Sequence, residues 1–550
     1  MDERWRVSQV LVEHFFRRFF DNDTIQVEGD TVTTVARAIA VVTVPGLMTA
    51  FFLQNQYPRR PLWGAIQDQY FFVLFSFVAM GAVTIFEWEM LFPDRLDFLI
   101  LSPLSVKPLQ MLATKAAALG GFLTLFLVSC NLFGAVILPA VSKGDFYRQV
   151  YAHTIAVLLA GVFAAFSFLA LAGVLLCVMG ATRFRAISPL MRMLSVMVLV
   201  LLMVHYVRFG GSMQAWLSPP LGMVRWMPPL WFLGVYEHLL RGNGAPAFAA
   251  EMARYAVRAT GIAAGLAVLT YPVAWARMRR MAVEGASSRK RQPPRWIAAM
   301  VGRLVRRPGE RGVFHFITQA IARNSRYQVY LAMYGGTGLA LAVACAVTFE
   351  TKGASVRPAL SVEGMHAVMP LLLFWVIAGL RTAFAFPLDR SAGWIFRVTG
   401  VSVGDCAAAG RRWVLSCSLG MMGATLAALR LAGWDFRRLL VQAVCGLCLC
   451  VLLTDGFFFF QQSVPLNTPR MPGRTNLPAV LTLYVGVLTP FIYGVIWVEM
   501  RMEKSLIKLL WLGLGAALLH AALSRLRNRT EEVEEEMEGY EGEFQLLGLS

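Results

Sequence analysis

The sequence predicts an all-α polytopic helical membrane protein, with about twelve transmembrane helices arranged as two parallel six-helix repeats. Of its 550 residues, 57% are hydrophobic and only 15% are charged, and the mean hydropathy is +0.58. These values exclude an ordinary soluble globular protein. The apolar residues form continuous runs rather than alternating at period two, so helices and not β-strands are expected to cross the membrane.

The apolar runs divide into two sets of six. Each run has about the 20 residues that a helix needs to cross the hydrocarbon layer. The first set lies near 32–54, 68–90, 116–139, 152–179, 190–209 and 255–276. The second set lies near 328–349, 365–386, 413–433, 437–460, 478–499 and 505–525.

Basic residues predict the orientation of the chain and the boundary between its halves. The segment 277–326 carries 13 Lys and Arg against two Glu, and a short segment of this charge stays on the cytoplasmic side. Counting spans from it places both termini in the cytoplasm. The expected regions are a first six-span half with an N-terminal amphipathic helix (1–276), a basic cytoplasmic linker leading into the second half (277–326), a second six-span half (327–525) and an acidic disordered tail (526–550).

Short segments outside the spans complete each half. Trp5 to Phe20 has the apolar and basic spacing of an amphipathic helix at the membrane surface, and Phe314 to Arg326 opens the second half comparably. The connection 210–253 is rich in prolines and aromatic residues, which predicts short helices or a re-entrant dip at the outer interface. The corresponding connection in the second half shrinks to Met500–Lys504, so the halves are homologous but not equivalent.

A matched segment follows the second span of each half. Phe92-Pro93-Asp94-Arg95 reappears as Phe386-Pro387-Leu388-Asp389-Arg390. At one constant offset, 102–106 matches 399–403 and Lys115 matches Arg412. Internal repeats are typical of transporter folds in which two half-bundles move against each other around a shared path.

This layout resembles the membrane subunit of type-2 ABC exporters, and more narrowly a bacterial subgroup of large fused permeases. The resemblance rests on the runs Phe92–Phe98 to Lys115 and Gly393–Thr399 with Arg411-Arg412-Trp413. It implies that segments 92–115 and 386–412 are coupling elements that seat on separate ABC ATPase subunits, with two copies expected for the two halves. It also implies the bacterial inner membrane as the location. The implied ATPase-coupling residues are Phe92, Pro93, Asp94, Arg95, Asp97, Lys115, Pro387, Asp389, Arg390, Trp394, Arg397, Arg411 and Arg412.

The motifs of nucleotide and metal enzymes are missing from the sequence. No Gly-Lys dipeptide occurs, so the chain has no phosphate-binding loop of the G-x-x-x-x-G-K-[ST] type. The seven His are scattered along the sequence rather than clustered as metal or general-base chemistry requires. We therefore expect a transport subunit without catalytic residues, cofactor or metal, with ATP hydrolysis on a partner chain. Membrane lipid is the other expected partner, and nucleic acid is not expected because the basic linker lacks a nucleic-acid-binding motif.

Charged residues close to the inner ends of two spans suggest a contact between the halves. Glu87 and Glu89 end the second span, and Arg381 ends the eighth at the repeat position that matches Glu87. One interpretation is an ion pair between halves. The alternative, equally weighted, is that all three side chains reach the membrane interface separately.

Two other classes of protein stay open. A secondary transporter of the major-facilitator kind also has six plus six spans, cytoplasmic termini and Asp-Arg dipeptides after spans two and eight. That family places Gly four residues before the Asp, where this chain has Met90 and Ala385. A membrane enzyme is the third alternative, and it requires converging carboxylates or His that the sequence does not reveal.

Overall fold

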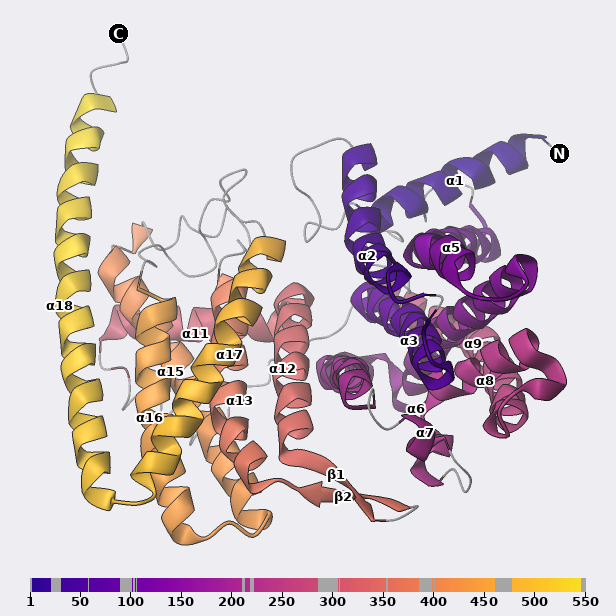
Figure 1. Ribbon diagram of the computed structural model, residues 1–550. Coiled ribbons are helices and arrows are strands. Elements are labelled where there is room, and N and C mark those ends of the chain that lie inside the picture. The colour runs from indigo at the N-terminus through magenta and orange to yellow at the C-terminus, as the bar shows by residue number, and fades with distance from the viewer. Residues whose placement is uncertain are drawn as a thin grey trace. The chain divides into compact units, whose positions relative to one another are not determined.

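The fold is known from a computed structural model, in which the chain is almost entirely helical (Figure 1). The structure describes residues 2–20, 31–57, 59–89, 101, 104, 106–209, 213–217, 222–284, 305, 307–352, 355–384, 398–399, 401–459 and 477–545. Among them, 11 helices are long and apolar enough to span a membrane, and a shorter apolar helix covers Ile39–Gln54 at the position of the predicted first span. The predicted all-α polytopic membrane architecture is confirmed.

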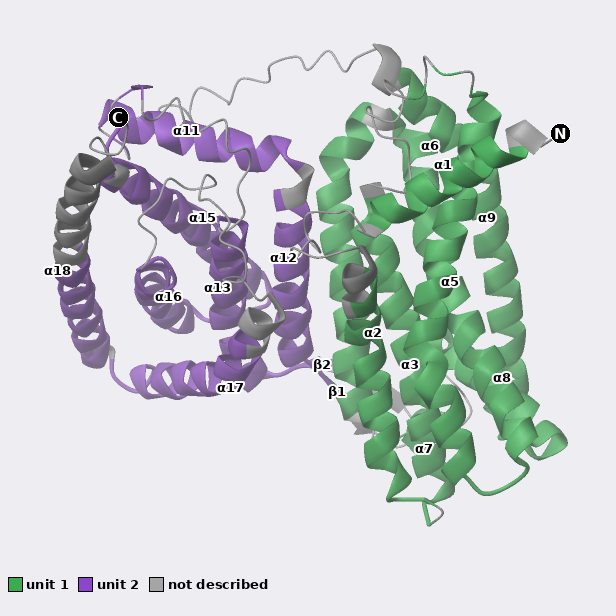
Figure 2. Ribbon diagram, turned by 90° about the horizontal axis from the view of Figure 1, so that it is seen from above, with its two compact units in different colours: residues 1–289, 349–357 green, residues 290–348, 358–550 purple. Residues whose placement is uncertain are grey.

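The chain forms two compact units (Figure 2). Unit 1 comprises Met1–Arg289 and Phe349–Arg357, and unit 2 comprises Lys290–Thr348 and Pro358–Ser550. The division between the units at 289/290 falls within the predicted linker 277–326.

Unit 1 contains all the described elements up to residue 284. In chain order they are α1 (Asp2–Phe20), α2 (Thr31–Gln54), α3 (Leu62–Phe86), η1 (Glu87–Glu89), α5 (Pro108–Val141), α6 (Phe146–Phe209), α7 (Met213–Trp216), η2 (Gly222–Trp226), α8 (Pro228–Arg241), η3 (Gly242–Gly244) and α9 (Phe248–Glu284). Helix α6 is two spans, Phe146–Gly180 and Thr182–Val207. They join at Gly180, whose φ of +74° is accessible to glycine and strained for residues with a Cβ. Arg277 of α9 donates hydrogen bonds to the carbonyls of Leu176 and Cys177, which end the first of these spans.

Helix α8 runs back along the first span of α6. Its Phe232 ring lies 5.3 Å from Phe163, its Tyr236 ring lies 5.6 Å from His153, and Arg148 donates to the Leu239 carbonyl at 3.1 Å. The contacts thus descend α6 over 15 residues, roughly 22 Å of helix. The connection 210–253 thus contains short helices, the first of the two expected arrangements, and one of them, α8, lies alongside a candidate membrane span.

Small and polar residues hold unit 1 together at its centre. Ser76 of α3 donates to the Val157 carbonyl of α6 at 2.7 Å and accepts from Asn131 of α5 at 2.9 Å. A Cβ placed on Gly161 would lie 2.3 Å from a methyl carbon of Leu127, so three helices approach where this glycine stands. Close approach at small residues and hydrogen bonds across helices are the usual sources of helix association in membranes.

Unit 2 contains the remaining helices. In chain order the elements are α11 (Pro308–Arg323), α12 (Ser325–Ala346), β1 (Val347–Lys352), β2 (Ser355–Leu360), α13 (Val362–Phe384), α15 (Val403–Leu431), α16 (Phe436–Phe457), α17 (Leu477–Met502) and α18 (Leu506–Gln545). Strands β1 and β2 form a two-stranded sheet, which was not foreseen, and residues 349–357 of this hairpin belong to unit 1.

Helix α18 extends far beyond its apolar part. Its candidate span ends at Arg527, yet the helix continues to Gln545 (Figure 1). Residues 526–545 of the predicted acidic tail are thus the last part of α18. Glu is a good helix former, and these residues continue a helix that the membrane span has already nucleated.

Candidate coupling site

The structure describes part of the predicted site. Lys115, Arg411, Arg412, Glu87, Glu89 and Arg381 lie in described helices. The other predicted coupling residues lie outside the described residues, namely Phe92, Pro93, Asp94, Arg95, Asp97, Pro387, Asp389, Arg390, Trp394 and Arg397. The geometry of the site is therefore that of the helices α5 and α15, which follow the two polar segments.

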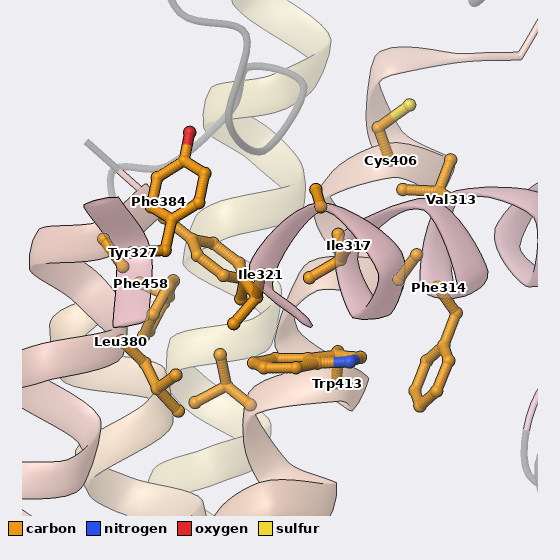
Figure 3. Packing of buried hydrophobic residues seen from close by; sticks show 14 of the residues in the cluster. Val313, Phe314, Ile317, Ile321, Tyr327, Leu380, Phe384, Cys406, Trp413 and Phe458 are labelled. Atoms are coloured by element: carbon orange, nitrogen blue, oxygen red, sulfur yellow. The ribbon is translucent and has the colours of Figure 1, made fainter. Parts of the chain in front are cut away.

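In unit 2 the amphipathic helix α11 packs its apolar face onto α13 and α15. Figure 3 shows Ile317 and Ile321 of α11 gathered with Trp413 of α15 and Phe384 of α13. Ile317 is fully buried, and the Trp413 and Phe384 rings lie 6.0 Å apart. Burial of such side chains contributes about 1.5–3 kcal/mol each, so the apolar face determines where α11 sits.

Polar contacts set the register of α11 on α15. Arg412 forms an ion pair with Glu310, whose side chain is only 2% exposed, and the Trp413 indole N–H donates to the Thr318 hydroxyl at 2.9 Å. Closer to the start of α15, Arg307 pairs with Asp405 at 2.9 Å. A buried carboxylate that has an arginine partner is sensitive to loss of that partner. The Glu310–Arg412 pair is thus the buried charged contact between the two helices, beside the Trp413–Thr318 hydrogen bond.

The start of α15 has its own cap. The Ser402 hydroxyl accepts a hydrogen bond from the Asp405 backbone N–H at 3.1 Å, as Ser does at helix N-caps. Asp405 then lies in the first helical turn, where a negative charge is favoured by the helix dipole. The end of segment 386–412 is therefore the structured first turns of a membrane helix.

In unit 1 the amphipathic helix α1 packs onto α5 in a comparable way. The Lys115 ammonium lies over the Phe15 ring at 5.4 Å from its centroid, and Gln110 donates to the Ser8 hydroxyl at 2.8 Å. Phe19 stacks on Phe122 with 4.8 Å between ring centroids. Lys115 is buried to 4% exposure, so its methylene stem also packs against apolar neighbours.

The matched basic residues therefore take matched positions within their units. Lys115 and Arg412, aligned at a constant offset in the sequence, both lie near the start of the helix that follows the polar segment. Each contacts the amphipathic helix that opens its half, through the aromatic ring of Phe15 in unit 1 and the carboxylate of Glu310 in unit 2. A movement of either polar segment would therefore move the helix that follows it, α5 or α15, together with the amphipathic helix that this helix contacts, α1 or α11.

The charged residues proposed to link the halves have neighbours within their own units. Glu87 is buried, and the Arg192 guanidinium of α6 lies close enough to stabilise its negative charge. Burial raises the pKa of the Glu87 carboxyl to about 8, and the Arg192 guanidinium opposes part of that rise. In unit 2 the Arg381 guanidinium lies over the Phe458 ring at 5.8 Å. The ion pair between halves stays a prediction.

Two clusters of ionisable groups were missed because they join residues far apart in the sequence. In unit 2, His366 of α13 lies between Glu499 of α17 and Glu503 just beyond that helix. Near the other end of α16, Asp455 contacts His520 and Arg527 of α18. For the first cluster the sequence offered one signal: Glu499 and Glu503 are two carboxylates four residues apart at the end of an apolar run. In the described part of the chain, no group of three or more His, Cys, Asp or Glu has the geometry of a metal site.

Comparison of the chain with models of protein families, with curated proteins and with solved structures gives no match.

Proposed function

We propose that the chain is the membrane-spanning permease subunit of an ATP-driven ABC exporter of the bacterial inner membrane, with both termini in the cytoplasm. It has no nucleotide-binding domain of its own in this proposal, and it couples to separate ATPase subunits through segments 92–115 and 386–412. One observation carries the proposal. Each segment leads into a helix that contacts the amphipathic helix of its own half through the matched residue, Lys115 or Arg412.

In the proposed mechanism, these helix pairs receive the force of the ATPases. Closure of the ATPase subunits on ATP displaces the two segments, and α5 and α15 tilt together with α1 and α11. Glu310 and Arg412 keep α11 and α15 moving as one body, since separating them would leave a buried carboxylate without its charge partner. ATP drives transport only if it binds the two conformations with different free energies, and the ATPase contact supplies that difference.

The experiment is a co-purification in mild detergent from the native host. An ATPase subunit that carries the phosphate-binding loop missing from this chain is expected to accompany it. Neutralising Asp94, Arg95, Asp389 and Arg390 together is expected to weaken the pairing. A matched control is Asp145→Asn, which changes an exposed charge in the turn between α5 and α6, at the opposite end of α5 from Lys115.

The outcome separates the candidate functions. An ATPase that is lost with the four neutralised residues but retained with Asp145→Asn supports the proposal. A chain that purifies alone, and that transports in vesicles without ATP when a proton gradient is applied, is instead a secondary transporter.

A further inference from the structure

A buried polar cluster lies at the end of unit 2 away from α11. His366 stands one turn inside the start of α13, whereas the α13 residues that pack with α11 lie at its other end. The His366 Nδ1 atom is 3.2 Å from Glu499 Oε2, and its Nε2 atom is 3.4 Å from Glu503 Oε1. The side chain of His366 is 5% exposed and that of Glu499 is fully buried. One imidazole ring thus lies between two carboxylates.

The number of protons in this arrangement follows from the donors available. A neutral imidazole has one N–H, so it donates to one carboxylate and turns a lone pair toward the other. Both ring nitrogens of His366 face carboxylate oxygens. Both carboxylate contacts are attractive when the three groups together hold one proton more than a neutral histidine with two carboxylates. The Gln442 amide nitrogen is a more distant neighbour of Nδ1, at 3.5 Å, and it makes its short hydrogen bond to Glu499 instead.

The surroundings of Glu499 require the same proton. Gln442 of α16 donates to Glu499 Oε2 at 2.6 Å. The other oxygen of Glu499, Oε1, is buried and has no hydrogen-bond partner among the described residues. An ionised carboxylate in a membrane span is costly unless it is paired and fully hydrogen-bonded. A shared proton, resident on His366 or on the carboxyl, removes that cost.

The charges of the other groups around the ring are compatible with the additional proton. Arg438 of α16 lies 3.8 Å from Glu503, and Trp434 places its ring edge-on to His366 at 4.8 Å. Helix α12 contributes no charge at this end, since Arg326 at its start is its one charged residue. Other titratable or charged residues near the cluster in the sequence or by contact are Glu363 of α13, Arg430 of α15, Asp435, Arg437 and Cys445 at or in α16, Arg501 of α17, and Lys504 after α17. With one proton added, His366, Glu499, Glu503 and Arg438 sum to zero net charge.

We propose that His366, Glu499 and Glu503 form a binding site for one exchangeable proton, and that this proton holds the end of α17 against α13 and α16. The Oε1 atom of Glu503 that faces the ring is buried, whereas the Glu503 side chain as a whole is 25% exposed, so this carboxyl connects the ring to water. Uptake takes a proton from water at Glu503 and adds it to the lone pair of His366, and release returns it by the same route. The inference does not depend on the ATP-driven function, because it concerns the folding of unit 2 alone.

The first test is the pH dependence of the apparent unfolding temperature of the full chain in detergent micelles, from about pH 5.5 to about pH 9, where histidines and perturbed carboxyls titrate. In the proposal, the folded cluster keeps a proton that the unfolded chain gives up as pH rises, so the contribution of the cluster to stability is expected to fall with rising pH. His366→Gln and Glu499→Gln are each expected to flatten this fall by a few degrees, on the order of 3 °C. The control His205→Gln changes a histidine whose Nδ1 faces a backbone carbonyl, that of Leu201, and it is expected to keep the wild-type slope.

The second test keeps His366, Glu499 and Glu503 in place, so it does not require the His366→Gln and Glu499→Gln variants to fold. Subtracting the emission of Trp434→Phe from that of the wild type isolates Trp434. Its emission is expected to be quenched by the protonated ring at low pH and to recover as pH rises. Equal pH slopes in wild type, His366→Gln and Glu499→Gln would overturn the proposal, as would a Trp434 emission that does not change over the range.

Discussion

Replacing Arg412 by Gln tests whether α11 and α15 move as one body. The change leaves the Glu310 carboxylate buried at 2% exposure without its cationic partner. Removing one member of a fully buried pair costs about 3–5 kcal/mol. The side chain of Arg412 is 45% exposed, however, so water already screens part of the attraction and we expect about 2 kcal/mol.

Hydrogen exchange of the α11 amides, followed by mass spectrometry, measures this loss. If α11 opens from α15 locally, its amides exchange in proportion to the open population. A loss of about 2 kcal/mol raises that population by about 30-fold. The matched control is Arg307→Gln, which breaks the Arg307–Asp405 pair at a side chain that is 74% exposed and is expected to change exchange by less than about threefold.

A double variant gives the clearest refutation. Glu310→Gln combined with Arg412→Gln removes both charges, so no buried charge is left unpaired, and exchange of α11 is expected to return most of the way to wild type. Unchanged exchange in Arg412→Gln, or no recovery in the double variant, would show that this pair does not hold α11 on α15.

Three further predictions concern packing, pH and the last helix. Gly161→Ala is expected to lower the apparent unfolding temperature, at a cost of about 1–3 kcal/mol, because its Cβ would lie 2.3 Å from Leu127, whereas Gly420→Ala has open space and is expected to be neutral. The pKa of Glu87 is about 8 in the folded chain, so Glu87 contributes stability that is lost as pH rises from about 4.5 to about 8. Glu87→Gln is expected to remove this contribution to the pH dependence, measured as the apparent unfolding temperature over a pH series. Asp455→Asn removes the negative charge that His520 and Arg527 share and replaces one of its two acceptor oxygens by an amide. It is expected to loosen α18 by about 1 kcal/mol, seen as faster hydrogen exchange in α18 but not in α13.

Local patterns predicted the helical elements well. Apolar length alone located the spans, and the spacing of apolar and basic residues located α1 and α11. Their ends were less accurate: α5 begins at Pro108 and not near 116, and α9 begins at Phe248 and not near 255. A span is recognised by its apolar middle, whereas the polar turns that extend a helix beyond the membrane carry no hydropathy signal.

The candidate site was predicted unevenly. Lys115 and Arg412 were identified from the repeat, but their partners Phe15 and Glu310 were not. A side chain on α11 meets α15 only after both helices have turned their apolar faces together. The hairpin of β1 and β2 was also missed, because a short polar connection between two spans looks the same in sequence whether it pairs or not.

Insertion into a membrane, the helical form of the spans and the duplicated halves follow from the sequence, since each depends on hydropathy or on similarity along the chain. Which ionisable groups meet does not. The contacts of Glu310 with Arg412, and of His366 with Glu499 and Glu503, join residues that lie 102 to 137 positions apart in the sequence, and they form only through the way the helices pack. A charge within an apolar run has the same appearance whether it faces lipid, water or a partner, and the cost of burying it is resolved only when a neighbouring helix brings the compensating group.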